Sequence, residues 1–260
     1  MLANFVFTHL PVLHPILANS DGGLVFAFQQ STLPGKLVLG VLFVGSVFSW
    51  SVMLSKMLML RVAKRQRELF LELFRRDRQP MSVFSEGLSF EGTPAFTVYQ
   101  AGCQELAYQL LGSSEVDESF ALRLESAKPL TPSQMRVVAV AMERAVGESA
   151  LNLESQMIIL ATAVSGAPFV GLLGTVWGVM ETFADVAKAG SASLAAMAPG
   201  VSAALITTVT GLLVAIPAMF GYNYLVTTVR GMIVEVDNFA AELISAMEHR
   251  YVSHRSDSSH

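Results

Sequence analysis

Beyond its first 20 residues, this chain has three long stretches that contain no Asp, Glu, Lys or Arg. They cover residues 37–55, 155–180 and 189–229, which are 19, 26 and 41 residues long. A helix needs about 20 consecutive apolar residues to cross the hydrocarbon core of a membrane. Each stretch therefore predicts one crossing, and the chain is predicted to be an all-α membrane protein with three transmembrane helices.

The polar positions around these stretches set the expected boundaries. We expect transmembrane helices at residues 37–59, 157–183 and 196–229. The pattern assigns the rest of the chain to four further segments: a periplasmic or interfacial N-terminal segment at 1–36, a cytoplasmic helical domain at 60–156, a periplasmic turn at 184–195, and a cytoplasmic C-terminal helix and tail at 230–260.

Basic residues flank the first crossing unequally. Only Lys36 precedes it, whereas eight basic residues lie between Lys56 and Arg78. Loops rich in Lys and Arg stay on the cytoplasmic side. The asymmetry predicts a multi-pass protein with its N-terminus outside the cell membrane and its C-terminus in the cytoplasm.

The polar middle of the chain has helix-breaking residues at the intervals expected for a helical domain. Pro and Gly residues separate expected helices at 57–78, 94–111, 115–126 and 132–156. No proline lies between Pro132 and Pro168. We therefore expect the helix that begins at Pro132 to continue into the second crossing, as one helix of about 75 Å. Residues 249–260 read as a polar tail.

Composition excludes several function classes. Only 15% of the residues are charged, against about 25% in ordinary soluble domains. Cys103 is the single cysteine, so the chain cannot form an internal disulfide. No basic patch with interleaved aromatics indicates nucleic-acid binding. No His, Cys, Asp and Glu spacing indicates a metal site, and no catalytic motif indicates an enzyme. Residues 1–20 lack the basic start of a secretory signal.

Small residues recur along one face of the second and third predicted crossings. In the second they are Ala167, Gly171, Thr175 and Gly178, with Gly174 beside them; in the third they are Gly200, Ala204, Thr208, Gly211 and Ala215. Small residues at three- and four-residue spacing let membrane helices approach closely. Helix packing alone accounts for any one of them equally well.

Five hydroxyl side chains add a second interpretation. Ser202, Thr175, Thr207, Thr208 and Thr210 fall within the two crossings, where they could line a path for an ion. Hydroxyls cannot hold a proton at neutral pH, and a proton relay in a membrane needs an ionisable group at depth. The middle of each crossing has none. If the protein moves ions, a partner must bring the titrating carboxylate.

Three prolines lie in or beside these crossings. Pro168 and Pro217 remove backbone donors inside them and can bend their helices. Pro199 is expected to mark the outer start of the third helix. A fixed bend for packing is favoured over a moving hinge.

Two sequence blocks carry a resemblance to a known family. GAPFVGLLGTVWGVMETF at 166–183 and APGVSAALITTVTGLLVAIPAMFGYNYL at 198–225 closely resemble the TolQ/ExbB/MotA proton-channel family, and TolQ/ExbB most. The resemblance implies a homopentameric ring in the bacterial inner membrane, with a periplasmic N-terminus and a cytoplasmic C-terminus. The ring would surround a TolR- or ExbD-like single-span partner, whose membrane Asp titrates against pore threonines. Thr175 and Thr208 match the family's threonine positions. Proton flow would then drive a TolA- or TonB-like protein indirectly, with no cofactor.

One position departs from the pattern of this family. TolQ and ExbB typically read APGIAEAL, and Ala203 stands here in place of that Glu. The departure leaves two alternatives beside a proton-driven motor. One is a sodium-driven version of the same motor, because hydroxyl and carbonyl oxygens can bind Na⁺. The other is a membrane scaffold that conducts no ion.

Overall fold

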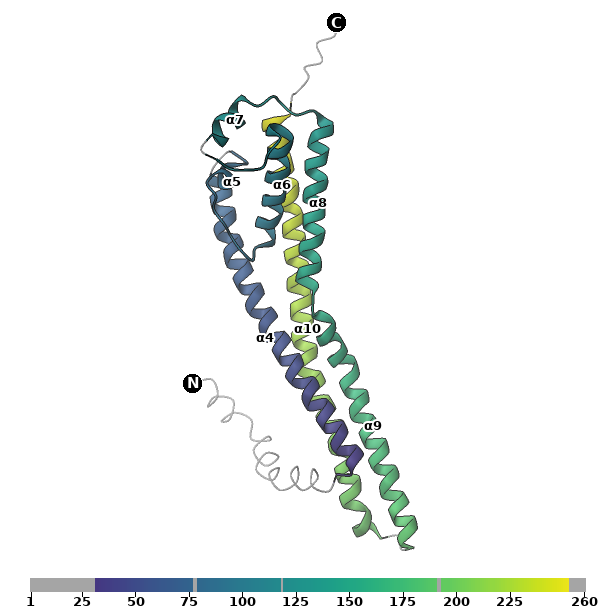
Figure 1. Ribbon diagram of the computed structural model, residues 1–260. Coiled ribbons are helices and arrows are strands. Elements are labelled where there is room, and N and C mark those ends of the chain that lie inside the picture. The colour runs from purple at the N-terminus through teal and green to yellow at the C-terminus, as the bar shows by residue number, and fades with distance from the viewer. Residues whose placement is uncertain (1–30, 77–78, 118, 191–192, 253–260) are drawn as a thin grey trace, which may run out of the picture. The chain divides into compact units, whose positions relative to one another are not determined.

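The computed structural model describes residues 31–76, 79–117, 119–190 and 193–252 (Figure 1). Within these ranges the chain is helical and has no strand. The helices are α4 (Leu33–Arg76), α5 (Ser82–Ser85), α6 (Pro94–Leu111), α7 (Phe120–Ser126), α8 (Pro132–Glu154), α9 (Met157–Ala189) and α10 (Leu194–Tyr251). Three helical segments, Leu33–Arg76, Pro132–Ala189 and Leu194–Tyr251, are long and apolar enough to cross a membrane. The all-α class and the three candidate spans are confirmed.

The helices divide between two compact units. Among the described residues, the first consists of residues 31–53 and 156–223, and the second of residues 54–155 and 224–252. The first unit therefore holds the most apolar parts of α4 and α10 together with all of α9. The second holds the polar middle of the chain with the remaining parts of α4 and α10.

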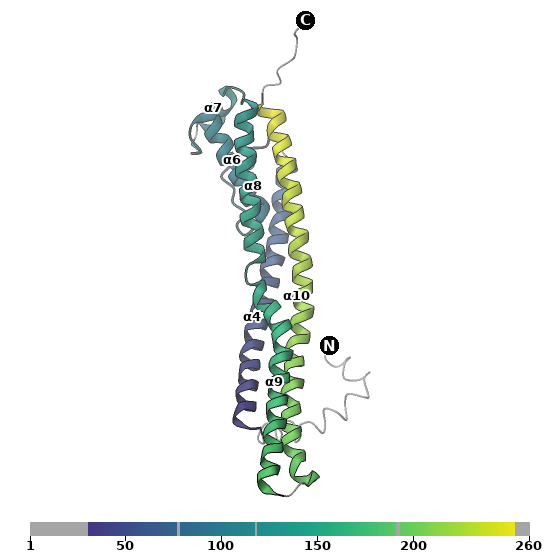
Figure 2. The ribbon, with the colours of Figure 1, turned by 90° about the vertical axis from the view of Figure 1, so that its right-hand side faces the viewer.

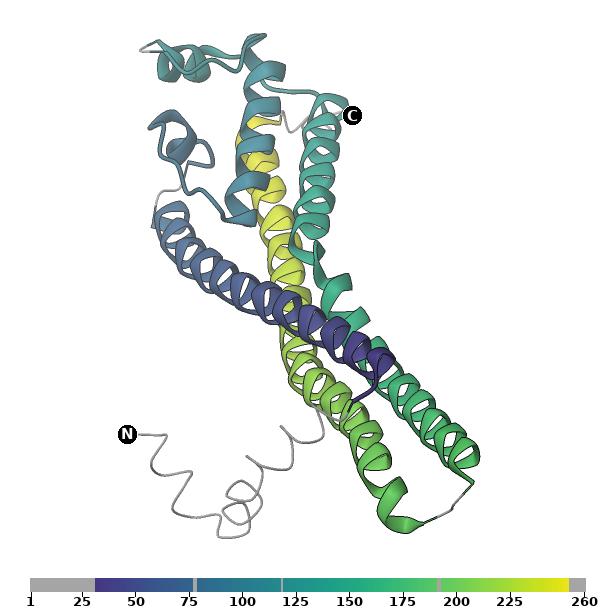
Figure 3. The same ribbon diagram turned by 60° about the horizontal axis from the view of Figure 1, so that its bottom comes forward.

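Aromatic side chains form the core of the second unit. Phe70 of α4 is fully buried, and its ring lies 5.3 Å from Tyr99 of α6 and 5.4 Å from Phe239 of α10. Gly102 lets α6 approach α8, because a Cβ there would lie 2.8 Å from Met142 Sδ. The helices that surround this core are seen in Figure 3. Burying these rings on several helices stabilises the unit through the hydrophobic effect.

The start of α8 agrees with the sequence pattern. Thr131 Oγ1 accepts a hydrogen bond from the Gln134 backbone N–H at 3.3 Å, and Gln134 Oε1 accepts one from the Thr131 N–H at 3.0 Å. This reciprocal capping satisfies two donors that a helix start leaves without partners. Pro132 occupies the first turn, where its missing N–H costs nothing.

The expected continuous helix from Pro132 into the second crossing was wrong. α8 ends at Glu154 and α9 begins at Met157. Gln156 between them has a φ of 65°, in the left-handed region that a residue with a side chain rarely adopts. No Pro or Gly lies at this break, so local sequence does not account for it.

Lys56 of α4 supplies a physical reason for the break. Its ammonium group donates to the carbonyl oxygens of Asn152 at 3.2 Å and Leu153 at 3.3 Å, and to Ser155 Oγ at 3.0 Å. The last carbonyls of a helix have no partner within it, and a cation there also interacts favourably with the helix dipole. Lys56 is 3% exposed. Its three donors stabilise an end to α8 that the sequence around 155 does not signal.

Several helix boundaries differ from those expected. Pro199 does not start the third helix, because α10 begins at Leu194 and continues through it. The tail begins later than 249, since α10 runs to Tyr251, where the Leu130 N–H donates to the Tyr251 carbonyl oxygen at 2.8 Å. α7 is shorter than the expected 115–126, and α5 was not expected. The expectations for residues 1–30 and 253–260 lie outside the described residues.

Candidate functional site

Glycines allow α9 and α10 to pack with their backbones in contact in the first unit. A Cβ on Gly171 would lie 2.7 Å from the Thr207 carbonyl oxygen, and one on Gly211 would lie 2.6 Å from the Ala167 carbonyl oxygen. No side chain fits at such distances from backbone atoms. Figure 2 shows the two helices running side by side. The small-residue face predicted from the sequence is therefore the contact face of this hairpin.

The same close contact extends toward the turn. A Cβ on Gly178 would lie 2.8 Å from Ala204 Cβ, and Gly200 packs directly against the side chain of Thr182. Ala203 and Ala204 are both buried. Gly174 contacts a third helix as well, since a Cβ there would meet Thr207 and, at 2.9 Å, Val38 Cγ1 of α4.

Three of the predicted hydroxyl groups meet at one point of this hairpin. Thr175 Oγ1 lies 3.2 Å from Thr207 Oγ1 and is in contact with Thr208 Oγ1. It also lies 3.1 Å from the Ala204 carbonyl oxygen and 3.2 Å from that of Gly171. We call Thr175, Thr207 and Thr208 the hydroxyl cluster. Residues 33 positions apart in the sequence thus form one polar spot between two apolar helices.

The members of the hydroxyl cluster differ in access. Thr207 is 0% exposed and can donate to the carbonyl oxygen of Ala204 at 2.7 Å or of Gly171 at 2.9 Å. Thr175 and Thr208 are half-buried. Thr207 therefore links the two helices from a fully buried position, whereas Thr175 and Thr208 are the partly exposed members of the cluster.

The other two predicted hydroxyls lie apart from the cluster. Thr210 Oγ1 donates to the Ile206 carbonyl oxygen of its own helix at 2.8 Å, a bond that satisfies a hydroxyl in an apolar setting. Ser202 is exposed. Pro168 and Pro217 lie within α9 and α10, which continue through them; the bends expected at these prolines stay predictions.

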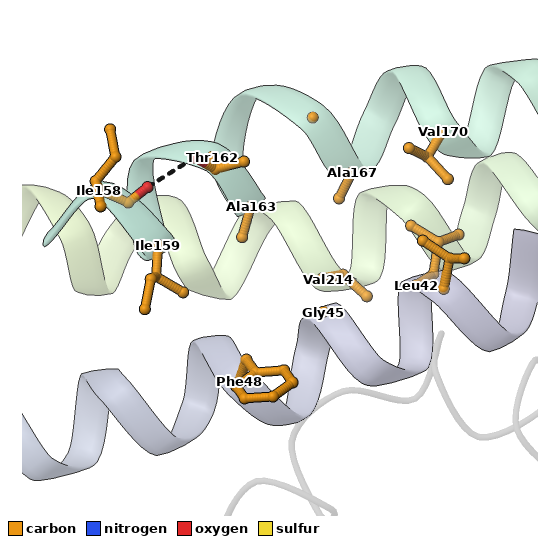
Figure 4. A pocket seen from close by; sticks show the side chains of 12 residues that line it. Leu42, Gly45, Phe48, Ile158, Ile159, Thr162, Ala163, Ala167, Val170 and Val214 are labelled. Atoms are coloured by element: carbon orange, nitrogen blue, oxygen red, sulfur yellow. Dashed lines mark hydrogen bonds between the residues drawn. The ribbon is translucent and has the colours of Figure 1, made fainter. Parts of the chain in front are cut away.

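A pocket on the α4 side of α9 is almost wholly apolar. It has a volume of about 360 Å³ and is seen in Figure 4, where Phe48 and Ile159 line it and Val214 lies at its back. The one hydroxyl there, Thr162, donates to the Ile158 carbonyl oxygen of its own helix at 2.8 Å. This pocket offers an ion no free polar group, unlike the hydroxyl cluster.

Sequence reasoning missed two polar contacts of this part of the chain. Trp177 Nε1 donates to Glu181 Oε1 at 3.1 Å in the second half of α9. Thr182 Oγ1 donates to the Gly178 carbonyl oxygen at 2.8 Å. Both span four residues within one helix. The side chains of Trp177 and Glu181 meet across one turn, whereas the Thr182 hydroxyl bonds to a backbone carbonyl of the preceding turn. Among the described residues, no three His, Cys, Asp or Glu side chains come together as metal ligands do.

Comparison with known proteins identifies the family to which this chain is similar. Residues 113–238 match the model of the MotA/TolQ/ExbB proton channel family. The Tol-Pal system protein TolQ of Pseudomonas aeruginosa is 32% identical over 232 residues, which cover 88% of this chain and 93% of that protein. The chain belongs to the MotA/TolQ/ExbB family.

Other members of the MotA/TolQ/ExbB family align over similar lengths. The Tol-Pal system protein TolQ of Haemophilus influenzae is 29% identical over 85% of this chain and 91% of its own length. The biopolymer transport protein ExbB of Pseudomonas putida is 31% identical over 217 residues. This alignment covers 84% of this chain and 61% of the length of that relative. The predicted resemblance is confirmed, and with three candidate spans the chain is a multi-pass membrane protein.

Proposed function

We propose that this chain is the channel subunit of an inner-membrane motor of the TolQ–TolR or ExbB–ExbD type, driven by an ion-motive force. In this proposal it assembles as a homopentamer around a TolR- or ExbD-like single-span partner. Flow of protons rotates the partner, and the work reaches outer-membrane processes through a TolA- or TonB-like protein. Membership of a proton channel family, with TolQ and ExbB relatives, supports this class of function.

The observation that carries the proposal is the hydroxyl cluster. Thr175 and Thr208 are half-buried in a hairpin whose sequence has no charged residue from 155 to 180 or from 189 to 229. An acid at this depth needs hydrogen-bond partners, because an unpaired polar group in hydrocarbon costs several kcal/mol. The cluster can supply them, and the chain lacks such an acid itself. We therefore expect a partner carboxyl group to titrate beside Thr175 and Thr208.

The test compares threonine variants in the assembled complex with its partner. Thr208→Val keeps the shape of the side chain but removes one partly exposed hydroxyl; we expect it to abolish proton uptake into vesicles while assembly is retained. Thr162→Val is the matched control, because Thr162 bonds only within α9 and lines the apolar pocket. If both variants conduct like the original protein, the hydroxyl cluster has no part in ion flow.

The ion itself is decided by a second measurement on the same vesicles. A proton-driven motor continues after sodium is removed and stops when a protonophore collapses the proton gradient. The reverse pattern would establish the sodium-driven alternative, which Ala203 and the oxygen-rich cluster leave open. If neither gradient drives an ion current and the complex still assembles, the scaffold alternative holds.

A further inference from the structure

A second pocket lies in the other unit, where the apolar stretches of α4 and α10 give way to charged sequence. It has a volume of about 240 Å³ and is lined by residues from Met57 to Lys64 of α4 and from Tyr224 to Glu235 of α10. Residues 37–55 and 189–229 are the uncharged stretches that precede it on the two helices. The pocket therefore stands at the level where hydrocarbon meets the polar headgroups of a membrane.

Two cations face this pocket without a partner of their own. Arg61 and Lys64 are three residues apart on α4, which places them on one face of the helix. Both are exposed, and neither forms an ion pair or a hydrogen bond with any residue in the described part of the chain. Their charges are available to an anion that enters from outside.

The single carboxylate in the lining does not cancel these charges. Glu235 forms an ion pair with Arg67, which lies about one turn beyond Lys64 on α4. The pair neutralises Glu235 locally and leaves Arg61 and Lys64 as an uncompensated charge of about +2. The pocket thus has the sign of charge that attracts an anion.

The rest of the lining fits an amphipathic ligand better than a free ion. Leu60 and Met232 are buried and form an apolar floor. Tyr224 is exposed and carries a hydroxyl that can donate to a bound oxygen. Thr228 can only accept, because its hydroxyl donates to the Tyr224 carbonyl oxygen at 2.9 Å. One side of the pocket is therefore cationic and the other is apolar.

We propose that this pocket binds the phosphate of an anionic phospholipid, with the headgroup against Arg61 and Lys64 and the glycerol end over Leu60 and Met232. Basic pockets between membrane helices on the cytoplasmic side have the charge and the position to hold such headgroups. The occupant is a lipid of the surrounding bilayer rather than a soluble anion, because the apolar floor has no role for inorganic phosphate. The proposal does not depend on ion conduction.

The test measures lipid binding to the purified complex in neutral detergent by native mass spectrometry. Phosphatidylglycerol, phosphatidylcholine and inorganic phosphate are added in separate titrations. Each of Arg61→Gln and Lys64→Gln removes one cation near the headgroup, so we expect each to weaken phosphatidylglycerol binding about fivefold. Lys64→Arg keeps the charge and is expected to bind as the original protein does.

Arg65→Gln is the matched control, because it removes the same charge from the neighbouring position outside the pocket lining. Equal loss in Arg65→Gln and Lys64→Gln would mean general attraction to a basic helix and would overturn the proposal. Equal affinity for phosphatidylcholine, or binding of inorganic phosphate at the same site, would overturn it too. A further result would also overturn the proposal: if Lys64→Gln leaves lipid binding unchanged but alters the mass of the assembly, the pocket is a contact between copies of the chain.

Discussion

Replacement of Lys56 by methionine tests whether this buried cation ends α8. Methionine retains the length of the apolar stem and loses the three donors that reach Asn152, Leu153 and Ser155. Two of these acceptors are carbonyls in the last turn of α8, where no intrahelical partner exists. We expect the variant to fold and to be less stable, with the loss concentrated at the end of α8.

The size of the loss follows from three opposing contributions. Hydrogen bonds from a charged group contribute about 1.5–3 kcal/mol each, and a cation at a helix C-terminus contributes up to about 2 kcal/mol. Against these stands the desolvation of an ammonium group that is only 3% exposed, which methionine avoids. The three bonds and the dipole together contribute roughly 5–10 kcal/mol, and the desolvation cost of several kcal/mol offsets much of this. We expect a net destabilisation of about 2–3 kcal/mol, which is roughly 5–10 °C in melting temperature for a unit of this size.

Thermal unfolding in detergent and amide hydrogen exchange measure the two parts of this prediction. We expect Lys56→Met to melt lower and to exchange faster at residues 152–157 than the original protein. Lys36→Met is the control, because Lys36 is an exposed lysine on the same helix. Equal melting temperatures for the two variants, with unchanged exchange at 152–157, would refute the view that Lys56 stabilises this helix end.

Three further predictions concern single positions. Gly171→Ala should disrupt the α9–α10 hairpin, because its Cβ would lie 2.7 Å from a backbone oxygen, whereas Gly166→Ala has open space and should melt as the original does; a melting scan of both variants in parallel distinguishes them. Gln156→Gly should raise the free energy of unfolding by about 1 kcal/mol, because glycine adopts the observed φ of 65° without strain; a lower melting temperature would contradict this. Cys103 should resist maleimide at pH 8 until the protein is unfolded, because it is fully buried and burial raises the pKa of its thiol; rapid labelling of the folded chain would count against the packing of this core.

The spans and the contact face of the hairpin could be predicted from the sequence because both depend on local patterns. Uncharged stretches identify membrane helices through the cost of burying charge, and the four- and three-residue spacing of Gly171, Thr175 and Gly178 identifies a face on which helices meet. The start of α8 at Pro132 was likewise predicted from a local signal, because a proline is favoured in the first turn of a helix.

The break at Gln156 could not be predicted, since its stabilising group comes from a residue about 100 positions earlier. For a similar reason, the sequence could not predict which hydroxyl side chains form the cluster and which lie apart from it. The sequence gives no reason to separate Thr207 and Thr208 from Thr210. The position of α9 decides which of these threonines contact Thr175. The helix start predicted at Pro199 was wrong, because α10 begins at Leu194 and Pro199 is its sixth residue. The sequence alone does not distinguish a proline at this position from one in the first turn of a helix.

The hydroxyl cluster contains more acceptors than protons. Thr175, Thr207 and Thr208 bring three hydroxyl hydrogens, and these are shared among two carbonyl oxygens and the hydroxyl oxygens themselves. A protonated carboxyl group that arrives here finds lone pairs ready for its hydrogen. An ionised one finds every hydrogen engaged and must draw one away from a carbonyl. If a partner carboxyl group binds here as proposed, we therefore expect the hydroxyl cluster to favour its neutral form over its ionised form, without any titrating group of its own.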